Sequence, residues 1–454
     1  MNSLEKLFNE KTTENGDISY KSTGNDMLDM LFMSSYYEKH LDEAYIKFIH
    51  MNEPDEKLRL FAMFMRDCRL GLGRRDYGRN LMFWAGVRPE NVIKCGRYDD
   101  LLYIGKIDEE YLEQIVNDGL GKGIYLAKKW LPRLNSRNKE LAKLICKNYG
   151  ITEKEYRRRI KLDTTENLLS RHRTNEIEFD HVPSLAMIKY FNRFERGEDT
   201  RERFEKYLEQ VRSGEKKLNI STTNVYDIYR NRDTIDADLF FDKLEKIKIS
   251  CIPILDTSGS MWDSNDSIGK AVSIAHYLAK CSTYCNGHVI SFSSNPKLIK
   301  ITERQKPQKT SWGFYESFGN SNKYSRELNS MYTGDCSNTD FGKVMELLEG
   351  LDDLPEYLVV LSDMEFDYGS NQSKKQLQKL WKDKGYTTKI IWWNFNSRNT
   401  TAPETDEMGN IFISGYNPML LKYLEAGFNG NMFLDKLLKE YHANLTKEYK
   451  KIRI

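Results

Sequence analysis

The chain has 454 residues, of which 39% are hydrophobic and 30% are charged, and its formal net charge is +2. This balance argues against a long disordered chain and against a membrane-spanning one, because apolar runs such as CIPIL and YLVVL are far too short to cross a bilayer. The start, MNSLEKLFNE, lacks the basic residues and apolar core of a secretory signal, and seven scattered cysteines favour reduced thiols. We expect a cytoplasmic protein of two or three domains with no membrane contact.

The first half of the chain is patterned as a series of helices. Apolar residues recur there at intervals of three and four, and several of these segments end in glycine, as helices commonly do. The clearest segments are 41–51, 56–70, 109–120, 138–150, 183–197 and 200–214. Helices in series favour a bundle or a solenoid of stacked helix pairs. We expect this all-α module to span residues 1–245.

Two stretches of this half are basic, although the whole chain is nearly neutral. Residues 121–173 carry 15 Lys or Arg against 5 Asp or Glu, and residues 57–97 carry 10 against 3. A protein that binds a polyanion needs such a local excess, because each neutralised phosphate releases a condensed counterion. A solvated helix face would give the same count, so charge alone leaves both interpretations open.

Two clusters within these stretches are candidates for contacting RNA, either single-stranded or structured. The loop GLGRRDYG follows a helix and lacks the G-x-G-x-x-G spacing, so its arginines suit phosphate contacts or a solvated turn better than a nucleotide loop. The second cluster mixes cations with Trp130 and Tyr156, as single-strand binding surfaces do, although both aromatics also suit core positions. The candidates are Arg66, Arg69, Arg74, Arg75, Arg79, Lys128, Lys129, Arg133, Arg157, Arg158 and Arg159.

The pattern changes at about residue 246. From KIKISCIPILD (246–256) to PMLLKYLEAG (418–427), short apolar strands alternate with helices. Strands that are apolar on both faces predict a mostly parallel sheet with helices on both sides, which is a doubly wound, Rossmann-like α/β domain. We expect this domain to span residues 246–454, after a stretch at 218–242 that is poor in apolar runs.

Polar residues follow the first strand of this domain directly. Asp256 ends the strand, and Ser258 and Ser260 lie in the turn after it. Thr339 at a helix start and Asp363 at the end of a later strand fit the same edge, where ligands of open α/β sheets bind. Each residue alone would be an ordinary cap or turn former. Together, a few hard oxygens suit Mg²⁺ or another divalent cation such as Mn²⁺ or Ca²⁺.

The combination of DTSGSM, Thr339 and LSDMEFD resembles the metal-ion-dependent adhesion site of von Willebrand factor type A domains. This resemblance implies that Asp256, Ser258, Ser260, Thr339 and Asp363 hold one divalent cation, often with water intervening. A helical module before such a domain resembles the Ro ribonucleoprotein autoantigens with their TROVE module. In those proteins helical repeats form a ring that binds structured RNA outside and single-stranded RNA ends in its hole.

Several stretches look closer still to a plant and viral family of unknown function with the same layout. The helical part is shorter than in the ring-shaped Ro proteins. The stretches that carry this resemblance are STGNDMLDMLF (22–32), RDCRLGLGRRDYGRNLMFW (66–84), GRYDDLL (96–102), AKKWLPR (127–133), FDHVPSLAMIKY (179–190), YLEQVRSGEKKLN (207–219) and LSDMEFD (361–367).

No Ser-His-Asp, Walker or zinc-protease signature is found, and His181 is interpreted as a helix-entry histidine satisfied by backbone. We therefore expect a non-enzymatic binding protein. Its helical module would bind RNA or an RNA–protein particle, and its cation site would bind a partner's acidic residue. A metal-dependent protein-interaction scaffold without RNA binding is the main alternative. A hydrolase that uses the metal with Asp256 and Asp363 is the weakest, since it calls for further acids or a histidine at the same point.

Overall fold

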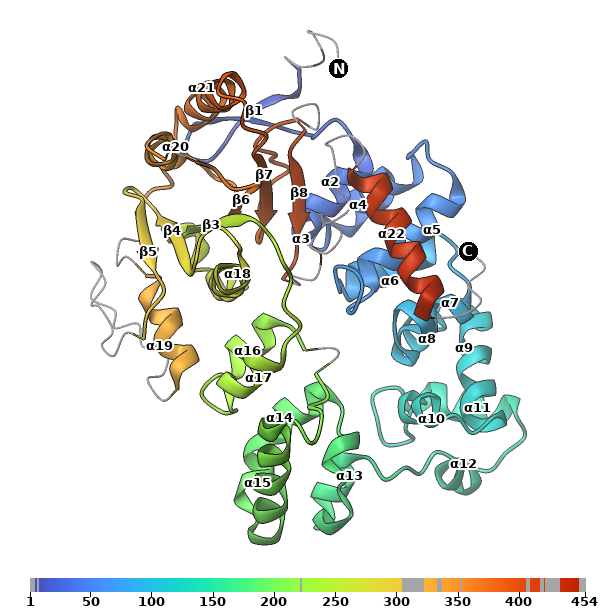
Figure 1. The fold of residues 1–454 in the computed structure, drawn as a ribbon. Coiled ribbons are helices and arrows are strands. Elements are labelled where there is room, and N and C mark those ends of the chain that lie inside the picture. Colours follow the sequence, from blue (N-terminus) through green and yellow to red (C-terminus); the bar gives the residue numbers. More distant parts are fainter. Residues whose placement is uncertain are drawn as a thin grey trace. The chain divides into compact units, whose positions relative to one another are not determined.

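The computed structural model describes residues 5, 8–220, 223–303, 322–332, 337–351, 353–405, 409–416, 420 and 433–448 (Figure 1). The chain forms two compact units. The sheet unit comprises Met1–Met51 and Ile220–Glu440, and the helical unit comprises Asn52–Asn219 and Tyr441–Ile454. A helical region and a C-terminal sheet domain are therefore present, as the sequence predicts. The division differs from the expected ranges 1–245 and 246–454, because both ends of the helical half belong to the sheet unit.

The sheet unit is built on six strands in the order β5-β4-β3-β6-β7-β8. All neighbouring strands are parallel except the edge pair β4 and β5, so the sheet is mixed. The central strands β3 and β6 are buried along their whole length, which explains why their sequences are apolar on both faces. The strands are β3 (Cys251–Asp256), β4 (His288–Phe292), β5 (Lys297–Lys300), β6 (Tyr357–Ser362), β7 (Lys389–Asn394) and β8 (Ile411–Ser414).

Helices cover this sheet on two sides (Figure 1). Helix α18 (Ser267–Cys281) packs on β3, β4 and β6, and the pair α20 (Phe341–Glu349) and α21 (Ser370–Asp383) packs together on the other side. Helices α16 (Val225–Asn231), α17 (Ala237–Lys243) and α19 (Lys323–Ser330) complete the unit, with α16 against α18 and α17 against α19. The segment from Ile220 onward therefore joins the sheet unit by packing on α18 and α19.

The described residues up to Met51 also belong to the sheet unit. Strands β1 (Glu10–Thr12) and β2 (Ile18–Tyr20) form an antiparallel hairpin, and helix α2 (Asp26–Phe32) lies beside β8, followed by α3 (Ser34–Tyr37) and α4 (Leu41–Ile49). The rings of Phe32 and Phe412 meet edge to face with centroids 5.1 Å apart. A helical pattern shows which face of a helix is apolar, but not which core that face joins, and this is why the sequence placed α2 in the helical half.

The helical unit is a succession of short helices. The segment expected at 56–70 ends early, because Asp67 leaves the helical conformation and its Oδ1 accepts hydrogen bonds from the backbone N–H groups of Arg69 and Leu70. No helix in the described part of the chain combines the length and apolar character that a bilayer crossing needs. The helices are α5 (Asp55–Arg66), α6 (Asp76–Trp84), α7 (Pro89–Cys95), α8 (Tyr98–Ile104), α9 (Glu109–Val116), α10 (Tyr125–Trp130), α11 (Lys139–Asn148), α12 (Glu153–Arg159), α13 (Thr165–Ser170), α14 (Ser184–Arg196) and α15 (Glu198–Ser213).

The end of the last helix, α22 (Phe433–Glu448), also belongs to the helical unit. Tyr441 is fully buried there, with its ring centroid 5.3 Å from that of Phe64 and its hydroxyl 3.2 Å from Asp67 Oδ2. This contact is the physical reason why the expected range 246–454 does not hold to its end.

Candidate functional sites

The loop after strand β3 brings a carboxylate and two hydroxyls together. Asp256 is fully buried, and its Oδ1 accepts a 2.9 Å hydrogen bond from the backbone N–H of Ser258. The hydroxyls of Ser258 and Ser260 lie 3.1 Å apart, and the chain continues in a single 3-10 turn. The loop therefore gathers the three side chains that the DTSGS spacing predicts.

The second carboxylate, that of Asp363, follows strand β6 and lies at the same sheet edge as Asp256. Leu361 pairs with Leu255, so Asp363 follows β6 at the same edge where Asp256 ends β3. The hydroxyl of Ser362 donates a 2.6 Å hydrogen bond to Asp256 Oδ2, which joins the two strand ends directly. The chain then reverses at Met364, whose φ of 70° lies in the left-handed region that a β-carbon disfavours. Backbone strain of this kind is frequent at functional sites.

The two carboxylates perturb each other because both are buried. Burial raises the pKa of Asp256 to about 7, and the nearby charge of Asp363 adds to the effect. Burial also raises the pKa of Asp363, while the guanidinium of Arg398 and a hydrogen bond from Ser260 act in the opposite direction. A cation bound beside both carboxylates would offset the cost of burying their charges. The donors are all hard oxygens, which fits Mg²⁺ better than a softer metal.

Thr339 lies on the segment that approaches this loop from α20. It is buried, and its carbonyl accepts a 2.9 Å hydrogen bond from the backbone N–H of Asp367. Two residues earlier, the carbonyl of Ser337 accepts a 3.3 Å bond from the backbone N–H of Gly259. The structure therefore brings the threonine segment to the DTSGS loop. Within the described residues no group of three or more His, Cys, Asp or Glu side chains is placed to share a metal, so a cation here depends on hydroxyls and water.

A guanidinium that the sequence analysis did not identify already contacts this site. Arg398, in the loop after β7, places Nη2 3.1 Å from Asp363 Oδ2 and Nη1 3.0 Å from Glu14 Oε2. Glu14 lies in the turn of the β1–β2 hairpin, and its backbone N–H donates a 2.8 Å hydrogen bond to Glu365 Oε2. Arg398 therefore neutralises Asp363, whereas Asp256 forms no ion pair with any described residue.

The hairpin is fixed to the loop that carries Asp363 by several further bonds. Thr13 Oγ1 donates to the carbonyl of Phe366 at 2.7 Å, and Asp17 Oδ2 accepts a 3.0 Å bond from the backbone N–H of Asn371. These partners are more than 350 positions apart in the chain. Contacts at such a separation leave no periodic signal, and this is why the sequence analysis missed Glu14 and Arg398.

Two members of the first arginine cluster, Arg66 at the end of α5 and Arg79 on α6, have a structural role, which corrects the expectation for them. Arg66 and Arg79 are buried, and both bind Asp100, with Arg66 Nη2 2.9 Å from Oδ2 and Arg79 Nε 2.5 Å from Oδ1. Arg79 Nη2 also lies 2.7 Å from Asp99 Oδ2. Charges held inside the unit cannot contact a polyanion on its surface.

The other arginines of this cluster are more accessible, but they also have partners. Arg75 is 59% exposed and pairs with Asp99 at 3.1 Å. Arg69 and Arg74 are half-buried, and Arg69 Nη2 donates to the carbonyl of Lys94 at 2.8 Å. Gly71 of the loop is required for close packing, since a β-carbon there would lie 2.0 Å from the carbonyl oxygen of Phe64.

The second basic cluster, on α10 and α12, faces solvent. Arg157, Arg158 and Arg159 are 65%, 79% and 43% exposed, and among the described residues they form ion pairs with Glu153 and Glu155 of their own helix. Lys129 is exposed and Lys128 is half-buried.

Arg133 differs from these cations, because its Nη1 donates to the carbonyl of Ile160 at 2.6 Å and so ties two segments together. Tyr156 is a core residue, with its hydroxyl 2.9 Å from the carbonyl of Pro132. Trp130 is half-buried beside Lys129, whose ammonium lies 5.8 Å from the ring centroid. The accessible part of the cluster is therefore Lys128, Lys129 and the three arginines of α12.

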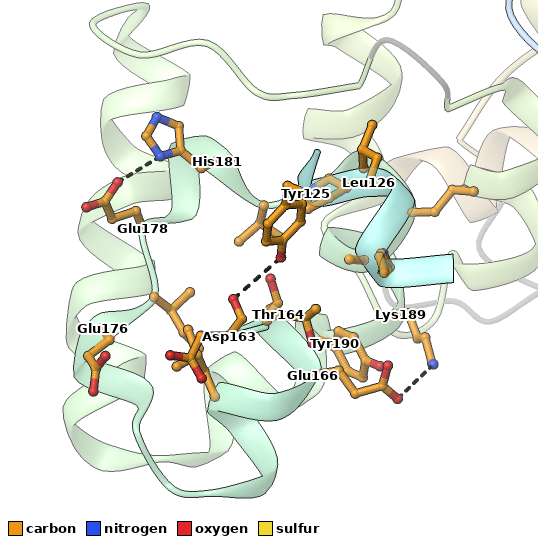
Figure 2. A pocket seen from close by; sticks show the side chains of 18 residues that line it. Tyr125, Leu126, Asp163, Thr164, Glu166, Glu176, Glu178, His181, Lys189 and Tyr190 are labelled. Carbon is orange, nitrogen blue, oxygen red and sulfur yellow. Dashed lines mark hydrogen bonds and ion pairs between the residues drawn. The ribbon is translucent and has the colours of Figure 1, made fainter. Parts of the chain in front are cut away.

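A cavity of about 550 Å³ lies in the helical unit between α10, α13 and α14 (Figure 2). His181 stands at it, 80% exposed, with Nδ1 2.7 Å from Glu178 Oε2. Its side chain therefore pairs with a carboxylate, and not with backbone as the sequence analysis expected. No pattern in the sequence indicates this cavity, because its walls come from separate segments of the chain.

Two families of unknown function match parts of this chain. The family described as "Domain of unknown function (DUF7788)" matches residues 250–451, and "Domain of unknown function (DUF2828)" matches residues 117–229. An uncharacterized protein of Acanthamoeba polyphaga mimivirus is 22% identical over 520 residues, covering 96% of this chain and 89% of that protein. The solved structure of the Deinococcus radiodurans Ro (RSR) protein is similar at 11% identity and a TM-score of 0.38, covering 91% of this chain and 93% of that one.

Proposed function

We propose that the chain is a non-enzymatic binding protein. Its helical unit contacts RNA or an RNA–protein particle, and its sheet unit holds a divalent cation, Mg²⁺ or a similar ion, to which an acidic group of a partner protein binds. The observation that carries the proposal is the buried pair Asp256 and Asp363, which lies beside the hydroxyls of Ser258 and Ser260 at one sheet edge.

The strand order supports a doubly wound domain similar to von Willebrand factor type A. From β3 the chain proceeds to β4 on one side, and from β6 it proceeds to β7 and β8 on the other. In open α/β sheets a ligand binds where the order reverses, beyond the carboxyl ends of the strands. Asp256 ends β3 and Asp363 directly follows β6, and these are the two strands that flank this point.

The chain's own residues have distinct roles in this proposal. Asp256 and Asp363 supply negative charge, and Ser258, Ser260 and Thr339 supply neutral oxygens. When bound, the cation offers an open coordination position to a partner's carboxylate. Hydrolysis would need a base aimed at the same point, and the adjacent Glu365 instead accepts a hydrogen bond from the backbone N–H of Glu14. We therefore favour binding over hydrolysis.

The exposed cations of α10 and α12 support the RNA-binding part. The arginines of α12 pair with carboxylates three or four positions away on the same exposed helix, and such pairs contribute only about 0–1 kcal/mol. A phosphate can therefore replace a glutamate at little cost.

A titration with labelled single-stranded RNA at several salt concentrations tests the RNA-binding part. We expect affinity to fall as salt rises, and EDTA to leave it unchanged. Replacing Arg157, Arg158 and Arg159 together by alanine should weaken binding and reduce the slope of log K against log salt by about 2, at roughly 0.7 for each phosphate that is no longer neutralised. Replacing Arg201, Lys206 and Arg212 together by alanine, three cations that are exposed on α15, controls for net charge. Absence of RNA binding at low salt would favour the protein-interaction scaffold.

A second measurement tests the cation site independently of RNA. Mn²⁺ binding, followed by the electron paramagnetic resonance of the free ion, should disappear on Asp256→Ala and persist on Asp383→Asn, an exposed position of α21. Retention of full affinity in the Asp256→Ala variant would refute the proposed ligand.

A further inference from the structure

The cavity of the helical unit has the size and walls of a small-ligand site. Its volume of about 550 Å³ lies within the roughly 300–1,000 Å³ that such sites occupy. Three large apolar side chains at it remain exposed, namely Tyr125 at 47%, Leu126 at 55% and Leu185 at 40%. A ligand that covers them removes apolar surface from water, which is favourable by about 25 cal/mol per Å².

Hydrogen-bonding groups also line the cavity. Figure 2 shows Tyr125 reaching across from α10 toward the segment of Asp163 and Thr164, with Glu166 and Tyr190 beside it. The contact from the Tyr125 hydroxyl to the Asp163 carbonyl is long, at 3.5 Å. The hydroxyl of Tyr190 is buried and makes no hydrogen bond of good geometry with a described residue, although Lys189 lies over its ring.

The charges at the cavity limit what can enter it. The carboxylates of Asp163 and Glu176 are already neutralised by Arg173, at 3.1 Å and 2.5 Å. The carboxylate of Glu166 has a weaker partner, because Lys189 lies 3.8 Å away and both side chains are about two-thirds exposed. A phosphate inside would meet the carboxylate of Glu166, whereas a neutral group with N–H donors would be bound by it.

A nucleobase combines the properties that this cavity selects. Its flat faces stack on aromatic rings, and its amino and imino groups donate to carboxylates and hydroxyls at its edge. Two lysines complete the match. Lys129 is exposed on α10 and Lys189 is 65% exposed on α14, so both can reach phosphates that stay outside. Lys129 also belongs to the accessible basic cluster of α10 and α12.

We propose that the cavity between α10 and α14 binds one unstacked nucleobase of a single-stranded RNA. Tyr125 stacks on the base, Glu166 and Tyr190 contact its polar edge, and Lys129 and Lys189 hold the flanking phosphates. This inference rests on the proposed RNA-binding function and names its base-binding site.

The test is fluorescence polarisation of labelled A6, C6, G6 and U6 RNA with the full chain and with Tyr125→Ala. Loss of one stacked base should weaken binding of the preferred hexamer roughly 5- to 150-fold, which corresponds to 1–3 kcal/mol. Because stacking displaces no counterion, the slope of log K against log salt should stay unchanged. Tyr149→Ala is the matched control, since Tyr149 is 41% exposed on the same unit but does not line the cavity.

A second variant makes the test independent of Tyr125. Leu185→Glu places a charge at an exposed wall position and should exclude the base without disturbing the core. If both cavity variants bind RNA normally while the α12 triple variant does not, the inference fails and the proposed function stands. In that case the cavity would suit an apolar protein segment instead. If the unmodified chain binds no RNA, the proposed function fails and this inference fails with it.

Discussion

Replacing Arg398 by glutamine should strengthen cation binding at Asp256 and Asp363. The Arg398 guanidinium lies 3.1 Å from Asp363 Oδ2, so an incoming divalent ion meets a like charge at one of its own ligands. At roughly 5 Å and an effective dielectric constant of 20, a divalent ion and a guanidinium repel each other by about 7 kcal/mol. The side chain is 34% exposed and can swing away, so the real cost is that of breaking its ion pair.

That cost sets the expected size of the effect. Asp363 is fully buried at its side chain while Arg398 is partly exposed, so the pair falls between an exposed ion pair and a buried charged hydrogen bond. We therefore assign about 1–2 kcal/mol to breaking the ion pair between Arg398 and Asp363. Removing the guanidinium should therefore tighten Mn²⁺ or Mg²⁺ binding roughly 5- to 30-fold, at a factor of ten for each 1.4 kcal/mol.

Isothermal titration with Mg²⁺ and resonance titration with Mn²⁺, both at low ionic strength, measure this effect. Lys379→Gln removes one positive charge from an exposed position of α21 and controls for net charge. Weaker binding in Arg398→Gln would refute the reasoning, because Arg398 would then orient Asp363 for the ion instead of competing with it. Equal affinity would show that the guanidinium and the ion do not share the carboxylate.

Two further predictions concern stability. Burial raises the pKa of Asp227 to about 6, above its ordinary value of 3.8. Between about pH 4 and 6 the folded chain therefore binds more protons than the unfolded chain. The free energy of unfolding falls as pH rises through that window. Asp227→Asn should raise the free energy of unfolding at pH 7 by about 1–2 kcal/mol and flatten this dependence, as urea melts at pH 5 and pH 7 would show. Arg79→Ala should lower the free energy of unfolding by about 3–5 kcal/mol, because it leaves Asp99 and Asp100 buried without this partner. Arg75→Ala should lower it by under about 1 kcal/mol, because Arg75 is mostly exposed. Equal losses of stability in urea melts of the two variants would contradict this difference.

The sheet edge was largely predictable because its signals are local. A buried strand requires continuous apolar residues, and a parallel sheet places the carboxyl ends of neighbouring strands together. The aspartates that follow CIPIL and YLVVLS could therefore be placed side by side from the sequence. In the structure Leu255 pairs with Leu361, so the aspartates that come after these two leucines lie at the same edge of the sheet.

Which arginines of the basic stretches are accessible was less predictable, because a charge count does not distinguish buried from exposed arginines. Arg66 and Arg79 became structural through Asp99 and Asp100, which lie 20 to 34 positions further along the chain. The acidic pair in GRYDDLL was a usable signal, since two adjacent aspartates at a helix start need nearby cations if they are buried. Within the described part of the chain, the exposed arginines of α12 form ion pairs with glutamates of their own helix.

Glu14 connects the least predictable part of the fold to the best predicted site. The hairpin turn holds Arg398 from one side at 3.0 Å, and Asp363 holds it from the other at 3.1 Å. A cation that takes Asp363 from Arg398 therefore leaves the guanidinium with Glu14 alone, on a side chain that is already partly exposed. If the proposed cation binds at the sheet edge, its binding is thermodynamically linked to the arginine contact of the N-terminal hairpin, and by reciprocity a change at Glu14 should alter the affinity for the ion.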